Sequence, residues 1–306
     1  MTEFLDAVVL LTNFVLVPGL TYGSQLALGA LGVTLIYGIL RFANFAHGDL
    51  MAFATMVVIL MTWLFQSMGL GIEPLPTALI ALPIGILAAI LLSLGTDRAV
   101  YRFYRRKKAP SVIYILTSIG VMFVINGIVR FTIGPDDQHF SDGARFIFTA
   151  RDFKEATGLH EGIALKLSQL LTVVTAIFVV LALFRFLQKS RTGKAMRAYS
   201  DNEDLALLSS VSPERVVFFA WVIAASLAAI AGTLYGLDKS FKPFTYFSLL
   251  LPIFASAILG GIGHPMGAIV GGFIIAFSEV TITYAYKKFL RYLLPESWEP
   301  ESHYDT

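Results

Sequence analysis

Long apolar runs constrain this chain most, because they leave few ways to keep it folded in water. A helix that crosses a bilayer needs about 20 mostly apolar residues. Runs of this kind occur at roughly 18–40, 46–66, 75–95, 110–132, 165–187, 215–237, 244–260 and 266–286. The composition agrees, since only 14% of the residues are charged, against about a quarter in an average soluble domain. The sequence therefore predicts an all-α, polytopic membrane protein with about eight transmembrane or re-entrant helices.

A shorter apolar run at 4–17 precedes Pro18 and Gly19. Three interpretations stay open for it: an interfacial helix, a first half-turn of the next span, or a separate pass. The whole chain, 1–306, is expected to form one transmembrane domain.

The charges between the spans predict the orientation. Basic residues gather in 96–109 and again in 188–215, whereas 134–162 is mostly acidic. Two spans separate the two basic segments, so both lie on one side of the membrane. Because Lys and Arg concentrate in cytoplasmic loops, we expect 96–109 and 188–215 to be cytoplasmic and 134–162 to be periplasmic. The basic cluster 287–291 then suggests a cytoplasmic end for the last span, and the parity works best if 244–260 is a re-entrant or half-length segment.

Glycines interrupt the last third of the chain between residues 260 and 267. Glycine and proline at this density break a continuous helix. Irregular backbone at membrane depth is tolerated only where protein or a water-filled cavity covers it. Spacing by four also places some of these glycines on one helix face. We predict close helix packing, or alternatively a hinge or dimer contact, at Gly260, Gly261, Gly263, Gly267, Gly271 and Gly272.

Polar side chains within the apolar spans are the candidates for the solute path. Such groups are costly to place in a membrane, so they are by default candidates for functional residues. Asn44 and His47 fall in the run Arg41–Asp49, which is alternatively an interfacial loop that caps its neighbouring helices. Asn126 lies four residues before Arg130, which is alternatively a snorkelling side chain. Glu279 lies in the last span, where it needs a polar partner or water, and its role is alternatively structural.

Segment 188–215 has the composition of a short amphipathic helix between two spans. Asp201 or Asn202 is suited to cap a helix whose first turn carries Glu203 and Asp204. Leu205, Leu207 and Leu208 give this helix an apolar face, and Arg197 precedes it. Ser212 and Pro213 then begin the next helix. We predict a docking site for a cytoplasmic partner; the alternative is a surface loop that packs on its own membrane domain.

Several kinds of chemistry are excluded. The chain has no cysteine, which removes disulfides and zinc–thiolate sites. Gly193-Lys194 is not preceded by the glycine of a P-loop, and neither a His-Glu-x-x-His nor a Gly-x-Ser-x-Gly motif occurs. No catalytic residue, metal or cofactor is therefore expected, and a net charge of +2 does not favour nucleic acid. If ATP drives this protein, another subunit binds it.

Three stretches resemble the permeases of branched-chain amino acid ABC transporters, specifically their H-type subunit. The first is 29–48, which contains Asn-Phe-Ala-His-Gly; the second begins at Gly193-Lys-Ala-Met-Arg-Ala; the third is the glycine-rich 257–272. Members of this family usually continue into one more apolar helix that closes on an Arg-Pro-Thr-Gly-like run. The tail 295–306 does not match that element.

The resemblance implies an importer in the bacterial inner membrane. A periplasmic solute-binding protein would deliver branched-chain or other small amino acids, two permease subunits would form the path, and cytoplasmic ATPase subunits would drive it. Alternatives are a relative for urea, short amides or aromatic acids, and a self-sufficient secondary transporter or channel. An intramembrane enzyme is a more remote alternative.

Overall fold

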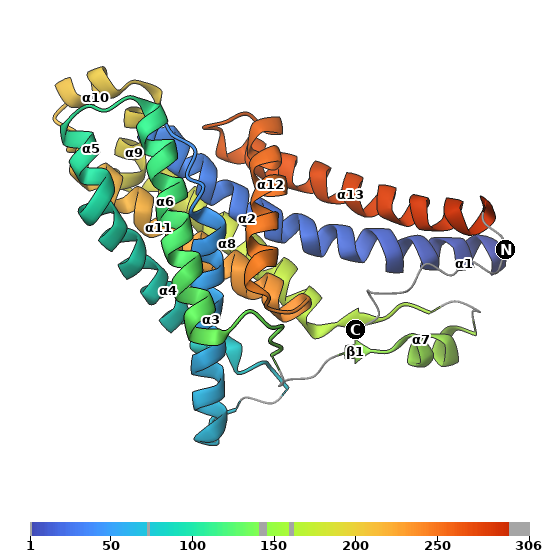
Figure 1. Ribbon diagram of the computed structural model, residues 1–306. Helices are drawn as coiled ribbons and strands as arrows, with labels where there is room; N and C mark the ends of the chain where they lie inside the picture. Colours follow the sequence, from blue (N-terminus) through green and yellow to red (C-terminus); the bar gives the residue numbers. More distant parts are fainter. Residues whose placement is uncertain (1, 72–73, 141–145, 159–161, 294–306) are drawn as a thin grey trace.

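The computed structural model is almost entirely helical and describes residues 2–71, 74–140, 146–158 and 162–293 (Figure 1). Seven of its helices are long and apolar enough to cross a membrane, which confirms the all-α, polytopic class. The elements in order are α1 Thr2–Leu11, η1 Thr12–Leu16, α2 Val17–Leu40, α3 His47–Ser67, α4 Ala78–Thr96, η2 Asp97–Tyr101, α5 Arg102–Arg106, α6 Ser111–Ile133, β1 Phe146–Phe148, α7 Ala150–Thr157, β2 Leu165–Lys166, α8 Leu167–Lys189, α9 Arg191–Asp201, α10 Glu203–Leu208, α11 Pro213–Asp238, α12 Pro243–Leu259 and α13 Pro265–Leu293.

The apolar run 4–17 belongs to the first span. α1, η1 and α2 form one continuous apolar helix from Phe4 to Leu40, 37 residues long. The π turn η1 ends at Leu16, two residues before Pro18. A proline has no N–H to donate to the preceding turn, and a widened turn accommodates that loss without ending the helix.

α2 forms the centre of the bundle. Most of its side chains are buried, and it packs against α8, α11, α12 and α13. A helix that is apolar on every side is suited to such a position. Its glycines admit bulky partners, since Gly19 faces Phe277 and Gly23 faces Phe273 on α13. Small residues on one helix and aromatic rings on the other thus bring α2 and α13 close together along their length.

The two basic segments lie at one end of the bundle. Arg102 of α5, in the first basic segment, forms a 2.9 Å ion pair with Glu214 at the end of the segment 188–215. At the other end, Gln138 pairs with Phe241 through their backbones, and β1 pairs with β2 beside α7. The predicted parity is therefore correct: 96–109 and 188–215 share one end, and the described part of 134–162 lies at the opposite one.

Of the predictions for the last two helices, the half-length segment is confirmed and the cytoplasmic end of the last span is wrong. α12 begins near Phe241 and ends at Leu259, and Gly263 in the break that follows lies close to Gly38 at the end of α2. α12 therefore runs from one end of the bundle toward the other with only 17 residues, which is the half-length alternative and not the re-entrant one. α13 then runs antiparallel to α2, and Tyr284 stacks on Phe14 of η1. The basic cluster 287–291 thus lies at the end opposite the other basic segments, because pairing with α2 sets the direction of α13.

Candidate functional site

The loop 41–46 turns into the bundle, so α3 begins inside the protein. Arg41 has a left-handed backbone with φ of 57° and ends α2. The N–H of Phe45 then donates to the Ser118 hydroxyl of α6 at 3.1 Å. The ring of His47 reaches Gly32 of α2, about two turns from the end of that helix. Asn44 and His47 are therefore held at depth rather than at the surface.

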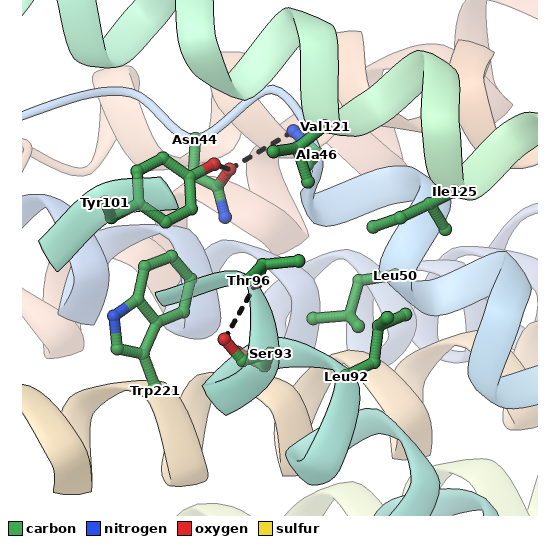
Figure 2. Close-up of a pocket in the computed structure, with 10 residues that line it drawn as sticks. All are labelled: Asn44, Ala46, Leu50, Leu92, Ser93, Thr96, Tyr101, Val121, Ile125 and Trp221. Atoms are coloured by element: carbon green, nitrogen blue, oxygen red, sulfur yellow. Dashed lines mark hydrogen bonds between the residues drawn. The ribbon is translucent and has the colours of Figure 1, made fainter. Parts of the chain in front are cut away.

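Asn44 lies at the polar end of a small buried pocket between α3, α4, α6 and α11 (Figure 2). Its side-chain oxygen accepts from the N–H of Ala46 at 3.2 Å and from the Tyr101 hydroxyl at 3.4 Å. The Ser93 hydroxyl is buried there without a hydrogen-bond partner among the described residues. The ten residues that line the pocket are Asn44, Ala46, Leu50, Leu92, Ser93, Thr96, Tyr101, Val121, Ile125 and Trp221.

His47 faces a different part of the bundle from Asn44. It is fully buried, and a Cβ atom at Gly32 would lie 2.6 Å from its Cε1 atom. The backbone of Gly29 faces the ring, but neither ring nitrogen makes a hydrogen bond of normal geometry among the described residues. His47 therefore fits against α2 by shape, and the absence of a side chain at Gly32 makes that fit possible.

Asn126 is tied to an acidic residue that the sequence analysis treated only as a helix cap. Its Nδ2 atom donates to Asp49 Oδ1 at 2.6 Å, and Arg130 one turn further along α6 faces the same carboxylate. Asp49 is fully buried in the first turn of α3, where the helix dipole favours a negative charge. A carboxyl two residues after His47 was the available signal, but only the structure shows that α6 covers it.

Glu279 does not join this group. It is exposed on α13, and its polar neighbours are Tyr22 of α2 and Tyr235 of α11. Glu279 lies beside Tyr22 of α2, and His47 lies beside Gly32 of the same helix. These two positions on α2 are about 15 Å apart along the helix. The structure thus brings Asn44, His47 and Asn126 to the region around the start of α3 and places Glu279 nearer the opposite end.

The segment 188–215 forms two short helices at the basic end of the bundle. Ser190 caps α9 by accepting from the N–H of Gly193 at 2.8 Å, and Asn202, not Asp201, caps α10 by accepting from Leu205 at 3.1 Å. Within α10 only Ala206 is buried. The three predicted leucines are exposed, Leu205 by 60%, Leu207 by 43% and Leu208 by 83%. The charged candidates around them are exposed too: Arg197, Asp201, Glu203 and Asp204.

α9 anchors this segment to the bundle while α10 projects from it. Met196 and Tyr199 are buried in an apolar cluster with α11. The Tyr199 hydroxyl donates to Glu203 at 2.5 Å. Burial, together with the neighbouring Glu203 carboxylate, raises the pKa of Tyr199. Its phenol therefore stays protonated and keeps the first turn of α10 joined to α9.

The predicted glycines divide between a turn and two helix contacts. Gly261 and Gly263 have φ of 88° and 90° in the break, a conformation that favours glycine. Gly260 and Gly267 lie backbone against backbone, and Gly271 lies against the carbonyl of Ser256. Gly272 faces Ala27 of α2. These contacts are the close packing that small residues allow; a hinge stays a prediction.

Fold and site together define a multi-pass membrane protein with buried polar groups at the start of α3 and an exposed apolar helix at its basic end. A family model described as "Branched-chain amino acid transport system / permease component" matches residues 15–297. The chain therefore belongs to this family of transport permeases, which are not enzymes.

Curated relatives agree with the family. The high-affinity branched-chain amino acid transport system permease protein LivH of Salmonella typhimurium is 29% identical over 85% of this chain and 82% of its own length. BraD of Pseudomonas aeruginosa, of the same description, is 29% identical over 86% and 84%. The probable permease LivH of Methanocaldococcus jannaschii is 28% identical over 89% and 81%. No solved structure matches the chain.

Proposed function

We propose that this chain is a permease subunit of an ATP-driven importer in the bacterial inner membrane, and that it passes branched-chain or other small amino acids. Its partners would be a second permease subunit, cytoplasmic ATPase subunits and a periplasmic solute-binding protein. Membership of the permease family supports the transport role. The names of the relatives support the solute class.

The observation that carries the energy-coupling part of this proposal is the exposure of α10. Leu205 and Leu208 lie on a helix outside the candidate membrane spans, where water rather than lipid would meet them. An amphipathic helix gains affinity by placing such apolar anchors in a groove of a partner. Because the chain lacks a P-loop, the partner that supplies the energy is a separate ATPase. The flanking charges Arg197, Asp201, Glu203 and Asp204 would set the register.

For the solute path we propose the region where loop 41–46 and the start of α3 meet α6. Asn44, His47 and Asn126 bring polar groups into an otherwise apolar part of the bundle. A permease that receives its solute from a binding protein needs only weak contacts, since a deep, strong site would slow release. Glu279 would contact the path nearer its outer end, and the glycines of the α12–α13 break would act as the hinge.

Reconstitution tests the proposal directly. The full chain would be combined in proteoliposomes with the second permease, the ATPase subunits and the solute-binding protein encoded beside it. Uptake of radiolabelled leucine that requires both ATP and the binding protein is the expected result. Uptake by the permease without the ATPase would instead favour a secondary transporter or channel. ATP-dependent uptake of urea, a short amide or an aromatic acid but not of leucine would retain the mechanism and correct the solute.

A further inference from the structure

A partly buried ion pair lies between the segment 188–215 and the pocket of Asn44. The helix that contains α4 and α5 widens into the π turn η2, Asp97–Tyr101, and the two buried residues of this turn are its first and its last. A π turn is rare and is found frequently at functional sites. Here it directs Asp97 and Tyr101 toward α11 and the loop 41–46, as their contacts show.

Asp97 receives donors from two directions. Arg105 of α5 binds both of its carboxylate oxygens, at 2.8 and 3.1 Å. The indole N–H of Trp221 on α11 donates to the same carboxylate at 2.9 Å. Bidentate guanidinium contacts fix geometry as well as charge. The carboxylate therefore joins a residue of the basic end to a residue that lines the pocket.

On the pocket side the contacts continue through aromatic rings to Asn44. Tyr101 stacks on Trp221 at 5.2 Å between ring centroids and also contacts Phe42 at 5.4 Å. Its hydroxyl reaches the Asn44 side-chain oxygen at 3.4 Å, as the orientation of the two side chains in Figure 2 indicates. The position of Asn44 thus depends on Tyr101, which rests on the ring that Asp97 holds.

On the other side the contacts reach α9 and α10. Tyr199, which donates to Glu203 in the first turn of α10, is buried in one apolar cluster with Tyr101 and Trp221. Arg41, at the start of the loop that carries Asn44, donates to the backbone carbonyl of Ser200. A shift of α9 and α10 would therefore act on Tyr101 and Trp221 through this cluster, and on Arg41 through its hydrogen bond.

We propose that Asp97 is the positioning residue that joins the segment 188–215 to Asn44. The proposal rests on the proposed function, in which that segment docks on the ATPase. Asp97 touches neither solute nor ATPase; it holds Arg105 on one side and Trp221 with Tyr101 on the other. When the ATPase moves α10, this carboxylate carries the displacement to the pocket. Without it, hydrolysis continues but moves Asn44 less.

The experiment measures coupling rather than assembly. Asp97→Asn keeps the shape and removes the charge, and Trp221→Phe keeps the ring and removes the single donor. Each variant would be purified with its partners and reconstituted with the binding protein and leucine. ATP hydrolysed per leucine imported is expected to rise about threefold or more for Asp97→Asn, the size found for residues that couple two sites. The rise for Trp221→Phe is expected to be smaller, and co-purification of the ATPase unchanged.

Matched controls come from the same chain. Trp63→Phe alters an indole on α3 that is partly exposed, and Asp136→Asn alters an exposed carboxylate at the opposite end; both should leave the ratio unchanged. An unchanged ratio in Asp97→Asn with normal assembly would overturn the proposal. If Asp97→Asn fails to assemble, an unchanged ratio in Trp221→Phe overturns it instead. If the wild-type complex shows no ATP-dependent uptake, the proposed function itself fails, and the proposal with it.

Discussion

α2 and α10 both carry several leucines, yet they are placed in opposite surroundings. Leu26, Leu28 and Leu31 of α2 are buried by helices of the same chain, whereas Leu205 and Leu208 of α10 are among its more exposed apolar residues. Exposed apolar residues on the spans, such as Phe123 of α6, are covered by lipid in a membrane. α10 lies outside the spans and has no such cover. The same residue type therefore stabilises the fold in one helix and, in the proposed function, contacts a partner in the other.

Labelling tests the largest difference between these two regions. The chain has no cysteine, so single cysteines at Leu207 of α10 and at Asp136 would report their sides of the membrane. We expect an impermeant thiol reagent applied to intact cells to label the cysteine at 136 and not the one at 207, with 207 becoming reactive after permeabilisation. Labelling at 207 with 136 silent would invert the orientation and remove α10 from the ATPase side.

The next largest effect is expected from substitutions that disturb the close packing around α13. A Cβ at Gly267 would meet the carbonyl of Gly260, which is backbone and cannot move aside, whereas a Cβ at Gly120 on α6 meets nothing within 4 Å. Gly267→Ala should destabilise the fold by about 1–3 kcal/mol, the cost of overpacking. Gly120→Ala should be neutral or stabilising by up to about 1 kcal/mol. Thermal unfolding of the detergent-solubilised protein distinguishes them, and equal midpoints would contradict the packing described above.

Replacement of Asn126 is expected to change the stability of the fold by a similar or smaller amount than Gly267→Ala. Replacement by Leu leaves the Asp49 carboxylate buried without its donor, which should cost about 1–3 kcal/mol. The double variant Asn126→Leu with Asp49→Leu removes both polar groups and should recover part of the loss. Unfolding midpoints of the three proteins form the test. If the single variant is as stable as the wild type, Asn126 does not support Asp49 and is free to serve the solute path alone.

The smallest expected effect is a local pH dependence at the end opposite α10. Asp152 accepts from the backbone N–H and the hydroxyl of Thr149 at the start of α7, which lowers the pKa of Asp152. Since the folded pKa is the lower one, the stabilisation is complete above the ordinary value of 3.8 and is lost as the pH falls through the lowered one. Amide protection of 150–157, corrected for intrinsic exchange, should fall below that pH and be flat in Asp152→Asn. An identical pH profile in both would contradict the cap.

Much of the fold follows from local sequence patterns. The apolar runs predict the spans, the basic and acidic segments predict which loops share an end, and Asn202 and Pro213 mark helix starts through their own backbone chemistry. The direction of α13 could not be predicted from local patterns. It depends on phenylalanines of α13 that pack on glycines of α2, which lie more than two hundred residues earlier in the sequence. The basic cluster 287–291 carried a statistical preference that this packing outweighed.

In the candidate site, too, some features could be predicted from local sequence and others could not. The exposed leucines of α10 were predictable from a short amphipathic pattern between two spans. The pairing of Asp49 with Asn126 and of Asp97 with Trp221 joins residues 77 and 124 positions apart. A single sequence holds no signal for such contacts, so Asp97 looked like one charge in a loop that was otherwise basic.

The central claim, that α10 is the surface on which the ATPase docks, is tested most directly by co-purification. Leu205→Asp with Leu208→Asp replaces both exposed anchors by charges that a groove lined with apolar groups would reject. Leu205→Met with Leu208→Met is the matched control, because it retains apolar anchors of similar size. We predict that the Asp variant inserts normally, with the wild-type unfolding midpoint, and loses the ATPase during purification, while the Met variant retains it. Full retention of the ATPase by the folded Asp variant would contradict the account and leave α10 as a surface helix without a partner.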